Sequence, residues 1–142
     1  MKFLIAVDGS DTSINAFERV ISMSRQWGGE HQFVLINVQQ PIPHADAFGL
    51  TAGMDGPLLQ QLGERELERA TLIAGQLGLS FEARTEIGPA AHRVAEIADE
   101  VNADMIVLGS KGRSNLANVL VGSVASRVPN YTKRPVLLIP PA

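Results

Sequence analysis

The sequence contains no cysteine among its 142 residues. Disulfide bonds, thiol catalysis and cysteine-based metal sites are therefore excluded. The absence fits a reducing compartment and leads us to expect a cytoplasmic protein. The chain also lacks the ~20 consecutive apolar residues that a membrane span requires. The apolar run 3–7 is too short for the core of a signal peptide. We therefore expect neither a membrane segment nor secretion.

Positive charge is not in excess either. Lys and Arg number 12 against 15 Asp and Glu, which gives a net charge of −3. General nucleic-acid binding needs a basic surface, so the charge balance argues against it. Lys111 and Arg113 nevertheless form a local basic pair. Hydrophobic residues make up 45% of the chain, which indicates a globular protein, and its length predicts one domain over residues 1–142.

Signs of catalytic chemistry are few. His31, His44 and His92 show no metal-ligand spacing with one another or with nearby carboxylates, so we expect structural or solvent-exposed roles for them. Ser110 and Ser123 have no evident His–Asp partners, which argues against a hydrolase triad. We therefore assign no catalytic or metal-ligating residue.

Short apolar runs alternate with stretches of helical periodicity along the chain. This alternation is typical of an α/β protein, and we expect a single doubly wound, Rossmann-like, five-stranded parallel sheet in the order 3-2-1-4-5 with helices on both faces. Strands are expected over 3–7, 33–38, 79–87, 105–108 and 135–140, and helices over 11–27, 59–77, 89–101 and 123–130. Pro129 is expected to limit the last helix. Trp27, Leu62 and Leu77 are expected to face the core, and the charged residues at 64–69 the solvent.

In this strand order the carboxyl ends of the first and fourth strands flank a ligand-binding crevice. The first strand ends at Asp8, which by itself could equally be a helix cap. The fourth is followed by glycines in the spacing Gly-x2-Gly-x9-Gly-Ser, from Gly109 to Ser123. This spacing matches neither a P-loop nor a Gly-x-Gly-x-x-Gly dinucleotide fingerprint. Each glycine taken singly is more simply a turn residue, but the spaced set favours a phosphate-binding site.

The chain resembles the universal stress protein family, in its nucleotide-binding branch, over essentially its whole length. The resemblance is carried by segments 7–10, 36–38, 104–113, 122–125 and 134–140. In that family the glycine spacing accompanies ATP binding. The resemblance therefore implies ATP as ligand, with AMP or ADP as alternatives. The sequence shows no second acidic cluster to organise a metal, so Mg²⁺ would be held mainly by the phosphates and water.

The resemblance also implies a role for individual residues. Asp8 would contact the ribose or nearby base, Val38 would offer its backbone to the adenine edge, and Gly109 would lie beneath the ribose and α-phosphate. The full set implied to bind the nucleotide is Ala6, Val7, Asp8, Val38, Gly109, Ser110, Gly112, Arg113, Gly122, Ser123 and Val124.

Family members dimerise through the last strand, and the apolar edge 135–140 suits such pairing. We therefore expect a homodimer, with an unidentified protein partner reading the nucleotide state. The function expected is that of an ATP-binding regulatory, stress-response protein with no or very slow hydrolysis. One alternative is a phosphoryl- or adenylyl-transferring enzyme on the same fold, in which Lys111 and Arg113 stabilise the transferred phosphate. Another is an interaction domain with an empty or AMP-filled crevice.

Overall fold

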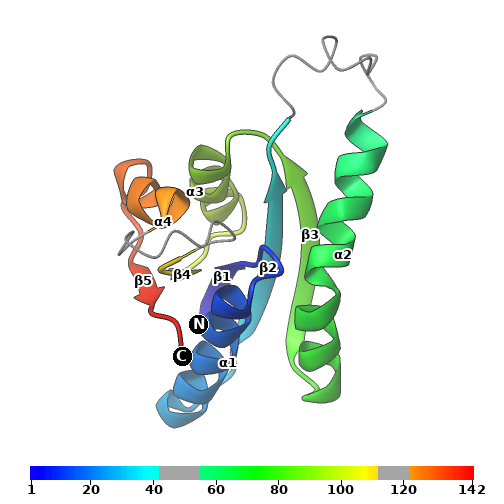
Figure 1. The fold of residues 1–142 in the computed structure, drawn as a ribbon. Helices are drawn as coiled ribbons and strands as arrows, with labels where there is room; N and C mark the ends of the chain where they lie inside the picture. Colours follow the sequence, from blue (N-terminus) through cyan, green and yellow to red (C-terminus); the bar gives the residue numbers. More distant parts are fainter. Residues whose placement is uncertain (42–54, 112–121) are drawn as a thin grey trace.

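Five parallel strands form one sheet in the order β3-β2-β1-β4-β5 (Figure 1). The structure is a computed structural model that describes residues 1–41, 55–111 and 122–142. The strands are β1 (Lys2–Ala6), β2 (Gln32–Gln39), β3 (Ser80–Ile87), β4 (Met105–Gly109) and β5 (Val136–Ile139). The predicted fold class, strand order and parallel direction are confirmed.

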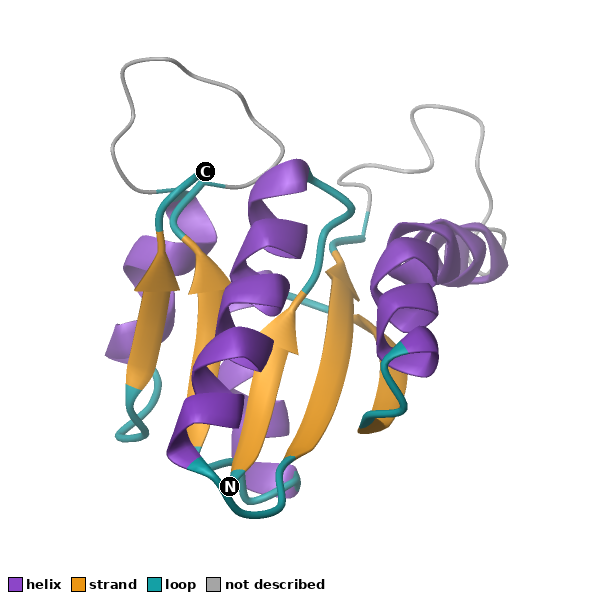
Figure 2. Ribbon diagram, turned by 90° about the horizontal axis from the view of Figure 1, so that it is seen from below, coloured by secondary structure: helices purple, strands orange, loops and turns teal. Residues whose placement is uncertain are grey.

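Helices cover both faces of the sheet (Figure 2). They are α1 (Asp11–Trp27), α2 (Asp55–Gln76), α3 (Ala90–Glu100) and α4 (Ser123–Arg127), followed by a 3-10 turn, η2 (Val128–Asn130). The residues of α1 and α2 share one apolar core with Phe3 and Ile5, whereas those of α3 and α4 share a second core with Leu4. The last predicted helix tightens into η2 at Pro129, since proline has no N–H to continue the α-helical pattern.

Three residues predicted to face the core are partly exposed instead. Trp27, Leu62 and Leu77 expose 47%, 36% and 45% of their surface. Trp27 is the last residue of α1 and stacks on Phe3, with 5.9 Å between the ring centroids. Leu77 follows the end of α2. Helical periodicity predicts which side of a helix faces inward, but not how completely neighbouring elements cover each residue on that side.

Helix α2 lies unusually close to the sheet at Gly63, which is buried. A Cβ at this position would lie 2.2 Å from Cγ2 of Thr85 on β3 and 3.0 Å from Oδ1 of Asn37 on β2. A side chain fits into that gap only if the Thr85 side chain, the helix or the strands move. The contact between α2 and the sheet, as the structure has it, therefore requires glycine at this position.

We expect Gly63→Ala to lower the free energy of unfolding by about 1–3 kcal/mol, because the added methyl group overpacks the contact. Denaturant unfolding measures the change. Thr85→Ser removes the Cγ2 atom and is expected to restore part of the loss in the double variant. Gly75→Ala is the matched control, since it lies on the same helix with no atom within 4 Å of an added Cβ. Equal destabilisation by the two alanines would contradict this account of the contact.

Candidate functional site

A cavity of about 360 Å³ opens at the carboxyl ends of β1, β2 and β4. Strand β1 is the point where the chain order reverses, because its neighbours are β2 on one side and β4 on the other. Ligands of doubly wound proteins bind at this position. The cavity therefore lies where the strand order predicts a crevice, and its volume lies within the range of small-molecule sites.

Most of the predicted nucleotide-binding residues are brought together around this cavity. Those that line it are Ala6, Val7, Asp8, Val38, Gly109, Gly122, Ser123 and Val124. Gly112 and Arg113 lie outside the described residues. Lys111, predicted to form a basic pair with Arg113 but not counted in the nucleotide-binding set, also lines the cavity. The strand ends and the start of α4 thus converge as the sequence pattern predicts.

Ser110 is buried and is not among the residues that line the cavity. Its N–H donates to the carbonyl of Ile139 at 2.8 Å, and its own carbonyl accepts the N–H of Gly122 at 2.6 Å. Its backbone therefore joins the end of β4 to β5 and to the residue before α4. In this structure Ser110 holds Gly122 in place at the cavity wall.

Asp8 lies half-buried in the turn between β1 and α1. Its Oδ1 atom accepts the N–H of Ser10 at 2.9 Å, and its own N–H donates to Oγ of Ser13 at 3.3 Å. The N-cap of α1 is Ser10, whose side chain accepts the N–H of Ser13. Asp8 is therefore not the helix cap. Its Oδ2 atom accepts no hydrogen bond from the described residues, which leaves an acceptor on a cavity-lining carboxylate.

Gly109 has a role in packing that the sequence pattern does not reveal. A Cβ on Gly109 would lie 2.8 Å from Cγ2 of Thr12 and 3.2 Å from the Thr12 backbone. Close packing of α1 against the end of β4 therefore requires glycine whether or not a ligand is bound. The residue also lines the cavity, so it serves both the fold and the wall of the site.

The cavity wall is mainly apolar and carries few charges. Asp8 and Lys111 are the only charged residues among those described that line it. The apolar part of the wall consists of Ala6, Val7, Ile36, Val38, Ala90, Val94, Leu108, Val124 and Ala125. Apolar walls with a few placed polar groups are typical of small-molecule sites. The arrangement suits a ligand that has both a flat apolar part and an anionic part.

Sequence reasoning missed two amide side chains on β2, Asn37 and Gln39. Both line the cavity and are buried, with exposures of 1% and 6%. The Nδ2 atom of Asn37 donates to the carbonyl of Val7 at 2.8 Å, and Nε2 of Gln39 donates to Oδ1 of Asn37 at 2.8 Å. Two amides on one face of an otherwise apolar strand indicate a polar cluster at that place, because buried amides need hydrogen-bond partners.

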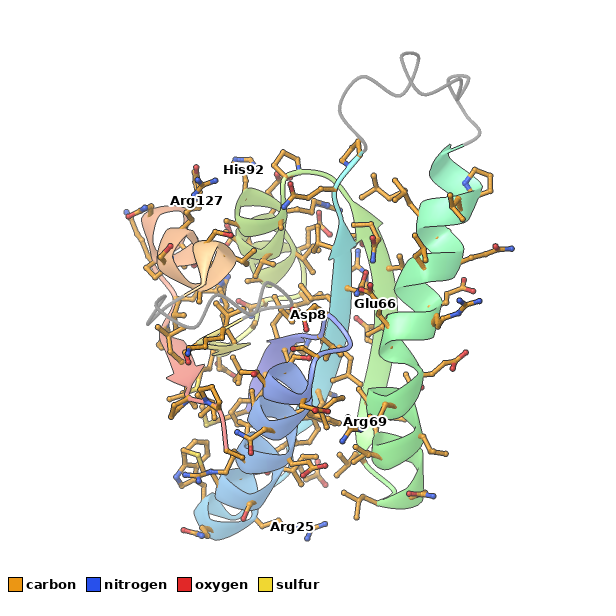
Figure 3. The ribbon with its side chains drawn as sticks, in the orientation of Figure 1. Asp8, Arg25, Glu66, Arg69, His92 and Arg127 are labelled. Atoms are coloured by element: carbon orange, nitrogen blue, oxygen red, sulfur yellow. The ribbon has the colours of Figure 1, made fainter. Side chains whose placement is uncertain are left out.

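One of those partners is Glu66 of α2, a residue predicted to face solvent. This prediction is wrong, because Glu66 is half-buried and its Oε2 atom accepts hydrogen bonds from both Asn37 and Gln39. The reason is helical spacing: Glu66 follows Gly63 by one turn, on the side of α2 that approaches the sheet. Figure 3 shows Glu66 pointing from α2 toward the turn that carries Asp8.

Other charged side chains serve the packing of α3 on β3. Arg93 donates to Glu86 at 3.0 Å and to Glu100 at 2.9 Å, and Arg84 also reaches Glu100. The hydrogen bond from Arg93, assisted by that from Arg84, lowers the pKa of the Glu100 carboxyl below its usual value. His92 is exposed and pairs with Glu96 one turn later in α3. These groups are paired with one another, and none of them lines the cavity.

In the described ranges, no three His, Asp or Glu side chains come together as a metal site. None of the helices in those ranges combines the length and the apolar character needed to cross a membrane.

Comparison with known proteins gives consistent matches. The model of the universal stress protein family matches residues 1–140. The universal stress protein MJ0531 of Methanocaldococcus jannaschii is 29% identical over 138 residues, which cover 97% of this chain and 81% of that protein. A crystal structure of a universal stress protein in complex with cAMP has a TM-score of 0.71 and 25% identity, with 100% of this chain and 98% of the other covered. An Arabidopsis thaliana family protein with AMP bound has a TM-score of 0.70 and 19% identity, with coverage of 100% and 92%. The chain therefore belongs to the universal stress protein family.

Proposed function

We propose that the cavity binds an adenine nucleotide, ATP in the first place with AMP or ADP as alternatives, and that the protein is a regulatory stress-response protein with no or very slow hydrolysis. The observation that carries the proposal is the convergence of Asp8, Val38, Gly109 and Gly122 on one cavity at the reversal point of the sheet. The relatives crystallised with cAMP and with AMP support an adenine nucleotide as the ligand.

The residues present fit the parts of such a ligand. The apolar wall that includes Ala6, Val7 and Val38 suits a base, and the second carboxylate oxygen of Asp8 suits a ribose hydroxyl. Lys111 and Ser123 supply a positive charge and a hydroxyl donor for phosphates. Gly112 and Arg113 belong to the same proposal on the strength of the family resemblance, although they lie outside the described residues.

The same set of groups supports the proposal of slow hydrolysis. Asp8 is the only carboxylate among the described residues that line the cavity, and the proposal assigns it to the ribose. A second carboxylate to hold a metal or activate water is missing from that described set. Mg²⁺ would therefore be held mainly by the phosphates and by water.

The test is to release bound nucleotide from the purified protein by heating, identify it, and measure binding of ATP, AMP, cAMP and GTP by calorimetry. We expect the adenine nucleotides to bind and GTP to bind more weakly. Rapid turnover of ATP that is lost in Lys111→Ala would instead indicate the transferase alternative. Failure of every nucleotide to bind would favour the interaction-domain alternative and contradict the proposal.

Lys111→Ala is expected to weaken ATP binding about tenfold, because a charge-assisted contact with phosphate is lost. Binding of adenosine, which has no phosphate, should stay unchanged in the same calorimetric assay. Lys133→Ala is the control, since Lys133 is exposed and does not line the cavity. An equal loss for ATP and adenosine would show that Lys111 does not act on the phosphates.

We further propose a homodimer that forms through residues 135–140. Strand β5 lies at the edge of the sheet, and Leu138 on it exposes 36% of its surface. An apolar edge strand is suited to pairing with a second copy. An additional protein partner and a cytoplasmic location, both expected from the sequence, stay predictions.

Leu138→Lys is therefore expected to shift the protein from dimer to monomer in analytical ultracentrifugation, because it places a charge in the apolar edge. Leu72→Lys provides a strict control. Leu72 is more exposed, at 61%, but lies on α2. A dimer that survives Leu138→Lys, or one that dissociates in both variants, would contradict the proposed interface.

A further inference from the structure

An acid–amide cluster lies behind the cavity, formed by Glu66, Asn37 and Gln39. A single carboxylate oxygen, Oε2 of Glu66, accepts Nδ2 of Asn37 at 2.6 Å and Nε2 of Gln39 at 2.9 Å. The two amides come from the end of β2 and line the cavity, whereas Glu66 comes from α2 and does not line it. The cluster thus joins a helix outside the site to the wall of the site.

The cluster also reaches the turn that carries Asp8. Nδ2 of Asn37 donates to the carbonyl of Val7 as well as to Glu66. Gly9 of that turn lies close to Glu66: a Cβ added at Gly9 would lie 3.3 Å from Cγ of Glu66 and 3.4 Å from its Cβ. Glu66 therefore lies next to the β1–α1 turn at Gly9 and is linked to it by hydrogen bonds through Asn37.

The carboxylate also determines which way the amides face. An ionised carboxylate only accepts hydrogen bonds, so both side-chain amides must turn their nitrogen atoms toward Glu66. Without the acceptor, each buried amide nitrogen would keep one partner, the carbonyl of Val7 for Asn37 and Oδ1 of Asn37 for Gln39, and would lose the other. A lost hydrogen bond at a buried donor is costly. We expect such a change to let the amides and the end of β2 reorient within the cavity wall.

We propose that Glu66 is a positioning residue for the nucleotide cavity, which fixes the end of β2 and the Val7–Gly9 turn from behind. The proposal rests on the proposed function, because it assigns Glu66 a role in nucleotide binding without contact with the nucleotide. Under this proposal, the affinity of the cavity for nucleotide depends on how α2 packs against the sheet. If Glu66 had a purely structural role, its substitution would lower the stability of the protein and leave the nucleotide affinity of the folded protein unchanged.

Two variants of matched length separate these roles in the full chain. Glu66→Met keeps the length of the side chain and removes the acceptor, whereas Glu66→Gln keeps a carbonyl oxygen that can accept both amides and removes the charge. Glu68→Gln is the control, since Glu68 is an exposed residue of the same helix. The readouts are the Kd of ATP by calorimetry, at a temperature where every variant is folded, and amide hydrogen exchange at residues 7–9 and 37–39.

We expect Glu66→Met to raise the Kd about tenfold and to speed exchange at both segments, with Glu66→Gln within about threefold of the wild type and Glu68→Gln unchanged. If Glu66→Met does not fold, Glu66→Ala takes its place with the same expected result. A Kd within twofold of the wild type in the folded acceptor-free variant would overturn the proposal, even if its melting temperature falls.

Failure of the wild type to bind any nucleotide would instead refute the proposed function. In that case, hydrogen exchange alone tests whether Glu66 positions the cavity wall. Faster exchange at residues 7–9 and 37–39 in Glu66→Met, absent in Glu68→Gln, would support the role of Glu66 in holding the cavity wall. Unchanged exchange would overturn it.

Discussion

The parallel pairing of β1 with β2 on one side and β4 on the other is the constraint on which the rest of the structure depends. The side chains of β1 alternate between the two apolar cores, Phe3 and Ile5 on one face and Leu4 on the other, and all three are fully buried. Because β1 is hydrogen-bonded along both edges, its end point is fixed. The turn at Asp8 therefore opens at a defined place between two neighbouring strand ends.

The sequence predicts those features that depend on local pattern. Apolar runs such as 105–108 predict the strands, because a strand buried on both faces needs continuous apolar side chains. The strand order 3-2-1-4-5 is one of those that general rules of chain connection allow, and the place of the crevice follows from that order. The predicted site residues at the strand ends, Asp8, Val38 and Gly109, lie around one cavity for that reason.

Features that depend on the distance between elements could not be predicted in the same way. Gly63 and Glu66 interact with β2 and β3 because α2 lies close to the sheet, and sequence periodicity carries no information on that distance. Glu66 belongs to a run of charged residues at 64–69, and for that reason it was predicted to face solvent. Gly109 shows the same limit, since the sequence pattern does not reveal that a glycine which lines the cavity is also required by its contact with Thr12.

The N–H of Ser110 donates to the carbonyl of Ile139 on β5, and the carbonyl of Ser110 accepts the N–H of Gly122, so the backbone of a single residue joins the edge strand to the cavity wall. A displacement of β5 would therefore be transmitted to Gly122, which lines the cavity.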